Sequence, residues 1–241
     1  MDIQYSTFCE CGKRPRNEDY IRVAELPETG RTLFVLCDGM GGHAMGDAAS
    51  HTVGDVFADY WLKTPEFGDC EKKVREACHK AIMAIDRKSA NLGNVQMGTT
   101  MVMASIEEDR LIIAHLGDSR CYLLRRGKDV PADTIDADVL QGCVMYQTQD
   151  HVTRQYGREL ITKGFFTNFH NAVDPDIRQF CLEPGDVIFL CSDGVDRYVG
   201  PLLILEELVS DKTAGQIAAT IAEYSRRMSL DNYSGIVVRV G

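Results

Sequence analysis

The sequence lacks any apolar run long enough to cross a membrane. Runs such as Leu33–Cys37 and Val187–Cys191 hold five residues each, whereas a membrane helix needs roughly 18 or more. The first residues also lack the basic-then-apolar pattern of a secretory signal. No Pro/Ser-rich linker or charge run divides the 241 residues. We therefore expect one domain over residues 1–241, located in the cytoplasm and away from membranes.

Cysteine pairs typical of zinc sites or disulfide frameworks are also missing. None of the nine cysteines forms a C-x2-C pair, and their number is odd. Cys37, Cys121, Cys181 and Cys191 lie inside apolar runs, which predicts reduced, buried thiols. Only the close spacing of Cys9 and Cys11 leaves open a disulfide or a pair of metal ligands.

An excess of positive charge is absent as well. The chain has 26 lysines and arginines against 36 acidic residues, which gives a net charge of -10. Nucleic-acid binding depends on clustered lysine and arginine, so this composition argues against a nucleic-acid partner. An acidic surface is instead compatible with hard cations, which bind oxygen ligands.

Short β-type runs bounded by turn residues recur along the chain, and helical spacing of apolar residues marks three further segments. The predicted strands are Ile3–Phe8, Tyr20–Ala24, Thr32–Cys37, Gly98–Ile106, Arg110–Leu116, Arg120–Leu124, Val144–Thr148, Ile177–Cys181, Val187–Cys191 and Gly235–Val240. The helical stripes begin at Ala49, Val74 and Ile217. Strands in consecutive groups predict stacked antiparallel sheets with helices outside. We expect Pro131–Asp138 to be a loop within a hairpin.

Aspartates at strand ends are the strongest chemical signal in the chain. They are Asp19, Asp38, Asp118, Asp193 and Asp231. One Asp-Gly pair is explained by a tight turn, but Asp38 and Asp193 each precede glycine after nearly identical apolar stretches, "VLCDG" and "FLCSDG". If the fold brings these acids together, cations must separate their charges. An oxygen-only ligand set favours Mg²⁺ or Mn²⁺ over Zn²⁺.

Seven motifs in order resemble those of the metal-dependent type 2C protein serine/threonine phosphatases of bacterial type. They are RPRNEDY, DGMGGHAMGDAAS, MGTTMVMASI, HLGDSRCYLLRRG, TQDH, LEPGDVIFLCSDGVD and DNYSGIVV, and they extend from about Arg14 to Val238. This resemblance implies an α+β fold, an α-β-β-α sandwich of two packed antiparallel sheets flanked by pairs of helices. It also implies a two-metal site at one end of the sheets.

The resemblance assigns roles to individual residues. Asp38 matches the carboxylate that bridges both ions, and the Gly39 carbonyl matches a ligand of the second ion. Asp193 and Asp231 match ligands of the first ion. Two adjacent acids match those that hold the second ion largely through water, Glu18 and Asp19. Asp118 matches the position that, with Asp193, holds a weaker third ion.

The implied reaction is hydrolysis of phosphoserine or phosphothreonine in proteins by direct attack of a metal-bridging hydroxide. Arg14 matches the phosphate-binding arginine, whose planar fork suits two phosphate oxygens. His43 could protonate the leaving alkoxide, although Met40 stands where eukaryotic relatives carry histidine. The implied partner is a phosphoprotein that a serine/threonine kinase also modifies, and we expect a monomer.

Other functions are compatible with parts of the sequence. Cys191 and Arg197 have the C-x5-R spacing of cysteine-dependent phosphatases, yet two aspartates lie between them and would repel a phosphate dianion. A catalytically silent binding module and a phosphatase of small molecules are further alternatives. The flap segment at about 150–176 is expected to be short, passing from a glycine turn directly to a strand, which affects substrate choice and the third ion.

Overall fold

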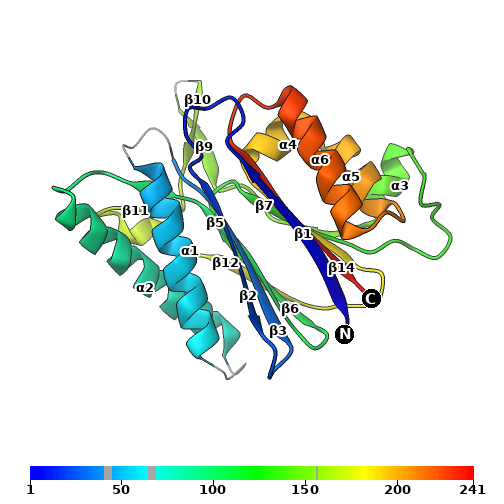
Figure 1. Ribbon diagram of the computed structural model, residues 1–241, viewed down its shortest axis with the longest axis horizontal. Helices are drawn as coiled ribbons and strands as arrows, with labels where there is room; N and C mark the ends of the chain where they lie inside the picture. The colour runs from blue at the N-terminus through cyan, green and yellow to red at the C-terminus, as the bar shows by residue number, and fades with distance from the viewer. Residues whose placement is uncertain (41–44, 65–68, 156) are drawn as a thin grey trace.

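Two five-stranded antiparallel sheets pack face to face in the computed structural model, which describes residues 1–40, 45–64, 69–155 and 157–241 (Figure 1). The first sheet has the order β1-β14-β13-β7-β8, with β1 Ile3–Glu10, β14 Tyr233–Val240, β13 Val187–Cys191, β7 Arg120–Leu124 and β8 Val144–Gln147. The second has the order β12-β6-β5-β3-β2, with β12 Asp176–Cys181, β6 Arg110–Leu116, β5 Met101–Glu107, β3 Arg31–Asp38 and β2 Asp19–Leu26.

Helices cover the outer face of each sheet (Figure 1). The second sheet carries α1 Gly46–Lys63 and α2 Cys70–Asn91. The first sheet carries α4 Asp193–Val199, α5 Pro201–Val209 and α6 Ala214–Met228, with the short α3 Ala137–Gly142 beside α5. The predicted α-β-β-α sandwich is therefore confirmed. The layer on the first sheet holds more than the expected pair of helices.

The central strands are buried on both faces. In β3, Leu33 and Val35 face the core beneath α1 and α2, whereas Phe34 and Leu36 lie between the two sheets. The strand β13 has the same alternation, with its apolar side chains divided between the inter-sheet core and the core under α4 to α6. Burial on both faces explains the continuous apolar runs of these strands.

All ten predicted strands are present, and one of them is divided. The run Gly98–Ile106 forms β4 Gly98–Thr99 and then β5, because β4 pairs with β11 Phe165–Phe166 whereas β5 pairs with β3 and β6. The chain turns away from the main sheet at this point. This departure brings the flap segment close to the end of β3.

The flap segment contains more regular structure than the sequence predicted. It forms the hairpin β9 Val152–Gln155 with β10 Arg158–Ile161, then β11, and then the 3-10 turn η1 His170–Ala172. The expected direct passage from a glycine turn to a strand is therefore wrong. The hairpin is mostly exposed and has no alternating apolar pattern, which is why periodicity did not reveal it.

Three helices, α3, α4 and α5, were also absent from the prediction. The helix α5 begins at Pro201 after Gly200, which has a φ of 84°, and this Gly-Pro pair is a helix-start signal. The predicted loop Pro131–Asp138 does connect the antiparallel neighbours β7 and β8, but α3 begins inside it at Ala137. The side chain of Asp136 caps that helix by accepting from the backbone N–H of Asp138.

The nine cysteines are free thiols. Cys37, Cys121 and Cys191 are buried as predicted. Cys181 is exposed, contrary to prediction, because β12 is an edge strand of the second sheet. Across the described parts of the chain, the helices are too short or too polar for one to pass through a bilayer.

Candidate active site

The predicted acidic residues meet in one cavity of about 150 Å³. Seven of the predicted site residues line it: Arg14, Glu18, Asp38, Gly39, Asp118, Asp193 and Asp231. Met40, at the position where eukaryotic relatives carry histidine, completes the wall with Thr100 and Ile161, which had no predicted role. Asp19 is buried directly behind it, opposite Asp38 in the β2–β3 ladder. His43 lies outside the described residues.

Asp38 is held rigidly at the end of β3. Its backbone N–H donates to Thr100 Oγ1 at 3.1 Å, and its carbonyl accepts from the Thr100 N–H at 2.9 Å. Thr99 Oγ1 donates to the same carbonyl at 2.9 Å. Thr99 and Thr100, at the break between β4 and β5, therefore fix the main chain of Asp38. The Asp38 side chain lines the cavity.

Gly39 is needed for close approach of three chain segments. A Cβ atom at this position would lie 2.4 Å from the Gly46 carbonyl oxygen and 2.6 Å from that of Glu18. The φ angle of Gly39 is outside the left-handed region, so the residue is not required for an unusual backbone conformation. The absence of a side chain allows the Gly39 N–H to donate to the Glu18 carbonyl at 3.0 Å.

Ser192 links Asp19 of the second sheet to β14 of the first. Its Oγ donates to Asp19 Oδ2 at 2.9 Å and accepts from the Ser234 backbone N–H at 3.0 Å. The next residue, Asp193, is the first of α4. A Cβ atom at Gly194 would lie 1.8 Å from the Asn232 carbonyl oxygen. The second Asp-Gly pair thus packs tightly against the loop that carries Asp231.

Asn232 fastens the N-terminal loop of the site. Its Nδ2 donates to the carbonyl oxygens of Cys11 and Arg16, both at 2.8 Å. Its Oδ1 accepts from the Glu18 N–H at 3.0 Å. This side chain therefore orders the loop on which Arg14 lies. Sequence reasoning quoted the "DNYSG" motif but missed this role, because the three partners are more than 200 positions away.

Arg14 reaches the cavity by pairing with an acid. Its Nη2 lies 2.6 Å from Asp231 Oδ2, and about half of its side chain is exposed. The other oxygen of Asp231 accepts from the Asn232 N–H at 2.8 Å. The guanidinium is thereby held at the rim, where it faces both solvent and the carboxylates.

Burial and mutual repulsion perturb the acids strongly. Burial raises the pKa of Asp19 to about 7 and that of Asp193 to about 6. Burial also raises the pKa of Asp38 well above its ordinary value, and the charges of Asp19 and Asp193 add to the effect. Oδ1 of Asp19 is buried without a hydrogen-bond partner. An all-oxygen cluster with unsatisfied charge and an orphaned carboxylate oxygen fits divalent cations such as Mg²⁺ or Mn²⁺.

Asp118 is already paired with a cationic side chain. Arg197 Nη2 lies 2.6 Å from Asp118 Oδ2, and Arg197 Nε lies 3.3 Å from Asp193 Oδ2. The same guanidinium lies 3.5 Å from Glu159 Oε2 on β10 of the flap. Burial raises the pKa of Asp118, and the Arg197 charge opposes that rise. Arg197 thus lies between the two carboxylates that were expected to hold a third ion.

The geometry contradicts cysteine-dependent catalysis. Cys191 is fully buried in the core beneath α4 to α6. Burial raises the pKa of its thiol well above the ordinary value, whereas a nucleophilic cysteine needs a lowered pKa. The second member of the spacing, Arg197, faces Asp118 and Asp193.

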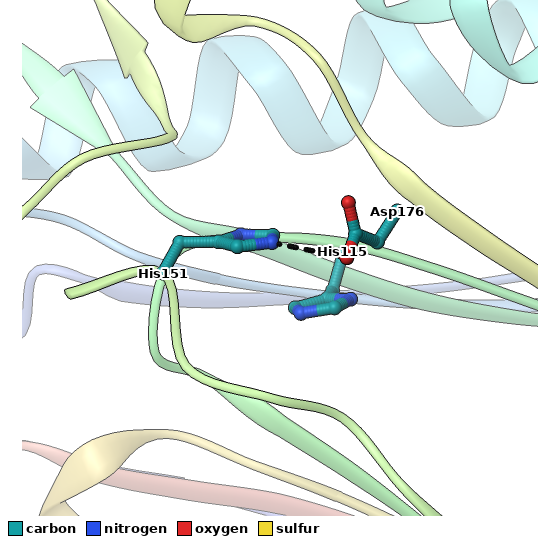
Figure 2. Close-up of side chains that lie close together, drawn as sticks. All are labelled: His115, His151 and Asp176. Atoms are coloured by element: carbon teal, nitrogen blue, oxygen red, sulfur yellow. Dashed lines mark ion pairs between the residues drawn. The ribbon is translucent and has the colours of Figure 1, made fainter.

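A second ionisable cluster lies at the β6–β12 pair (Figure 2). His115 and Asp176 are opposite each other in this ladder, and His151 Nε2 lies 3.4 Å from Asp176 Oδ2. The two imidazole rings are stacked, with centroids 4.4 Å apart and planes inclined by 7°. Metals bind imidazole nitrogens through lone pairs in the ring plane, and two parallel planes do not converge on one ion. The cluster therefore does not fit a metal site.

His151 instead positions the turn before Asp118. Its Nδ1 accepts from the Gly117 N–H at 3.2 Å, which places the proton of the neutral ring on Nε2, facing Asp176. Its backbone N–H donates to the Gly117 carbonyl at 3.0 Å. Burial lowers the pKa of His151, and it lowers that of His115 to about 4. The "TQDH" histidine thus has a structural role beside the cavity.

An α-β-β-α sandwich with an acidic, oxygen-lined cavity at one end defines the class of metal-dependent phosphatases, and comparison with known proteins agrees. Residues 21–181 match the family model described as protein phosphatase 2C. Protein phosphatase PhpP of Streptococcus pneumoniae is 28% identical over 244 residues, covering 98% of this chain and 97% of the relative. Serine/threonine protein phosphatase PstP of Mycobacterium tuberculosis is 31% identical over 230 residues, covering 94% of this chain and 43% of the relative.

Solved structures show the same architecture. The catalytic domain of PstP in complex with two manganese ions superposes with a TM-score of 0.75 at 29% identity, covering 99% of both chains. A bacterial serine phosphatase superposes with a TM-score of 0.79 at 26% identity, covering 100% of this chain and 98% of that one. The chain belongs to the protein phosphatase 2C family and is a metal-dependent phosphatase.

Proposed function

We propose that this protein hydrolyses phosphoserine and phosphothreonine in proteins with two Mg²⁺ or Mn²⁺ ions. The observation that carries the proposal is the convergence of Asp38, Asp193 and Asp231 on one small cavity. Asp38 would lie between the two ions, and Asp193 and Asp231 would hold the first. The Gly39 carbonyl, with Glu18 and Asp19 acting largely through water, would hold the second. Bound divalent cations supply an activated water and neutralise phosphate charge.

The chain's own residues would orient the phosphate. Arg14 is at the rim with one edge paired to Asp231, so its planar fork can bind phosphate oxygens without leaving its anchor. Asn232 keeps the loop of Arg14 in place. His43 remains the proposed proton donor for the leaving alkoxide, and it lies outside the described residues.

We propose two ions as the working complement. Asp118 and Asp193 remain the candidate ligands for a third ion, but the Arg197 guanidinium occupies the position between them. A fixed positive charge there can balance the two carboxylates without a cation from solution. The flap hairpin contributes Glu159 to the same guanidinium.

The proposed substrate is a phosphoprotein that a serine/threonine kinase modifies, and the proposed working form is a monomer in the cytoplasm. Reversible phosphorylation needs an enzyme for each direction, which is the reason for proposing a kinase opposite this phosphatase. A silent binding module would be expected to lack a metal-binding carboxylate, and every matching carboxylate is present. No described residue of the site favours small phosphorylated molecules over phosphoproteins.

Turnover of phosphothreonine peptides and of a generic aryl phosphate tests the proposal. Each substrate is assayed with Mn²⁺, with Mg²⁺ and with chelator. Hydrolysis that requires a divalent ion and survives thiol alkylation is expected. Chelator-resistant turnover, or no turnover of any substrate with either ion, would refute it.

A further inference from the structure

An apolar groove of about 550 Å³ adjoins the acidic cavity. Its apolar lining consists of Met40, Leu160, Ile161, Phe166, Phe169 and Ala172. Met40 and Ile161 line the acidic cavity as well, so the two hollows share a wall. The groove is thus continuous with the place where a phosphorylated side chain would enter.

Glycines make room for the groove's aromatic floor. A Cβ atom at Gly98 would lie 2.9 Å from Phe166 Cδ1, and one at Gly164 would lie 3.1 Å from Phe166 Cε2. The same Cβ at Gly164 would lie 3.3 Å from Met40 Cε. The Phe166 ring and the Met40 side chain therefore lie against bare backbone. The pairing of β4 with β11 fixes this arrangement.

Phe169 is exposed on a firmly anchored loop. Phe169 is 62% exposed, although both neighbouring residues bind Asp86 on α2. The Asn168 N–H donates to Asp86 Oδ1 at 3.2 Å, and His170 Nε2 lies 2.6 Å from Asp86 Oδ2. A rigid loop that presents an aromatic ring to solvent loses little conformational entropy when a ligand covers the ring. Leu160, on the flap hairpin, is 46% exposed.

The apolar lining of the groove and its position beside the acidic cavity indicate which ligand binds there. The only ionisable side chain in the groove's lining among the described residues is Glu159, and it also faces Arg197. A peptide whose phosphorylated residue enters the acidic cavity must cross the shared wall at Met40 and Ile161. In an extended peptide, side chains two residues apart point to the same side, about 7 Å from each other. Such a side chain would reach the groove.

We propose that this groove binds an apolar side chain of the substrate, two residues from the phosphorylated serine or threonine. The inference rests on the proposed function and names the substrate class that the site prefers. Leucine, isoleucine, methionine and phenylalanine fit the lining, whereas an acidic residue would be buried against apolar groups and beside Glu159. Phe169 and Leu160 are the specificity-determining residues.

A matched series of phosphothreonine peptides tests the groove. Leucine, serine or glutamate is placed in turn at each position from three before to three after the phosphothreonine. We expect leucine at one of the two positions that are two residues away to raise kcat/KM roughly tenfold over serine, the effect of burying one apolar side chain. In each of the variants Phe169→Ala and Leu160→Ala, the preference for leucine over serine should fall toward one. Aryl phosphate turnover of each preparation normalises for active enzyme.

The control variant is Ile135→Ala, which removes an apolar side chain that is 79% exposed and remote from the groove, in the segment before α3. It should retain the leucine preference in full. Equal kcat/KM for all peptides, or a preference that survives both groove substitutions, would overturn the proposal. Binding of the same peptides, labelled and measured by fluorescence polarisation, tests the groove independently of turnover. An enzyme that cleaved no substrate would refute the proposed function, yet selective, groove-dependent binding of leucine peptides would still support the groove.

Discussion

Arg197 and Asp118 form a close ion pair, with Nη2 and Oδ2 2.6 Å apart, and the Asp118 side chain is only 4% exposed. The same guanidinium also contacts Asp193, a proposed metal ligand. A permanent cation therefore contacts two carboxylates of the acidic cavity before any metal ion binds. This pair connects the helix α4, the turn after β6 and, through Glu159, the flap hairpin.

Replacing Arg197 should change the metal content. In Arg197→Gln, the carboxylates of Asp118 and Asp193 lose their cationic partner, so we expect one additional Mn²⁺ per chain. Titration calorimetry and elemental analysis should give about two ions for the wild type and three for the variant. Arg226→Gln, which breaks an exposed pair with Glu223 on α6, is the control. Three ions bound by the wild type, with no change in Arg197→Gln, would contradict the expectation.

Replacing Asp38 should separate activity from stability. Asp38→Asn removes the carboxylate proposed to lie between two ions, so kcat/KM for aryl phosphate should fall roughly a thousandfold or more. In chelator the same change removes buried repulsion with Asp19 and Asp193. Its unfolding midpoint should therefore rise by about 3 °C for each kcal/mol gained. Asp138→Asn, in the remote helix α3, should change neither quantity, and normal turnover in Asp38→Asn would refute the site assignment.

The metal-free protein should lose stability as the pH rises from 6.5 to 8. A carboxyl whose folded pKa is raised keeps its proton in the folded state, so its stabilising effect is complete below the unfolded value of 3.8 and is lost as the pH rises through about 7 for Asp19. The lowered pKa of His115 has the opposite effect below the ordinary histidine pKa of 6.5, which is why the pH window begins there. Urea unfolding in chelator should show a loss of roughly 1–3 kcal/mol.

Two additions check the origin of that loss. Saturating Mn²⁺ should abolish it, because the ions stabilise the ionised carboxylates. Asp38→Asn should reduce it, because one of the interacting acids is gone. Stability that rises over the same pH interval in chelator would show that the cavity acids are not the groups that titrate.

Asn232→Ala should weaken substrate binding and the fold together. The change removes the Asn232 hydrogen bonds to the carbonyl oxygens of Cys11 and Arg16 and the acceptor of the Glu18 N–H, at a cost of about 1–3 kcal/mol in free energy of unfolding. The loop of Arg14 would loosen, so we expect KM for aryl phosphate to rise severalfold. Asn91→Ala, at the exposed end of α2, is the control. An unchanged KM at reduced stability would show that the loop does not orient phosphate.

The sequence predicted the parts of the fold that depend on apolar periodicity. Strands such as β6, β7 and β13 have the bounds that short apolar runs and turn residues indicated, and α1, α2 and α6 have apolar stripes against the cores. The hairpin β9–β10 and the helix α4 lack such a pattern. Tertiary contacts specify these elements, so local signals did not reveal them.

The candidate site was predictable for a different reason. Repeated Asp-Gly pairs and the motif order selected residues such as Asp38 and Asp193, and these side chains do meet at one cavity. Arg197 and Asp118, which form an ion pair, are 79 positions apart. Asn232 and the loop residues to which it donates are more than 200 positions apart. No spacing rule encodes those contacts, because they exist only once both sheets are assembled.

The acidic cavity takes Asp38 from one sheet, with Asp19 buried behind it, whereas Asp193 and Asp231 flank β13 and β14 of the other sheet. Cations bound there would cross-link the two sheets at one end of the sandwich. The supply of divalent ions would then affect the stability of the contact between the two sheets as well as the turnover of the enzyme. Without these ions, this end of the sandwich would be held by hydrogen bonds such as those of Ser192 with Asp19 and of Asn232 with Glu18, and it would be more open to proteases.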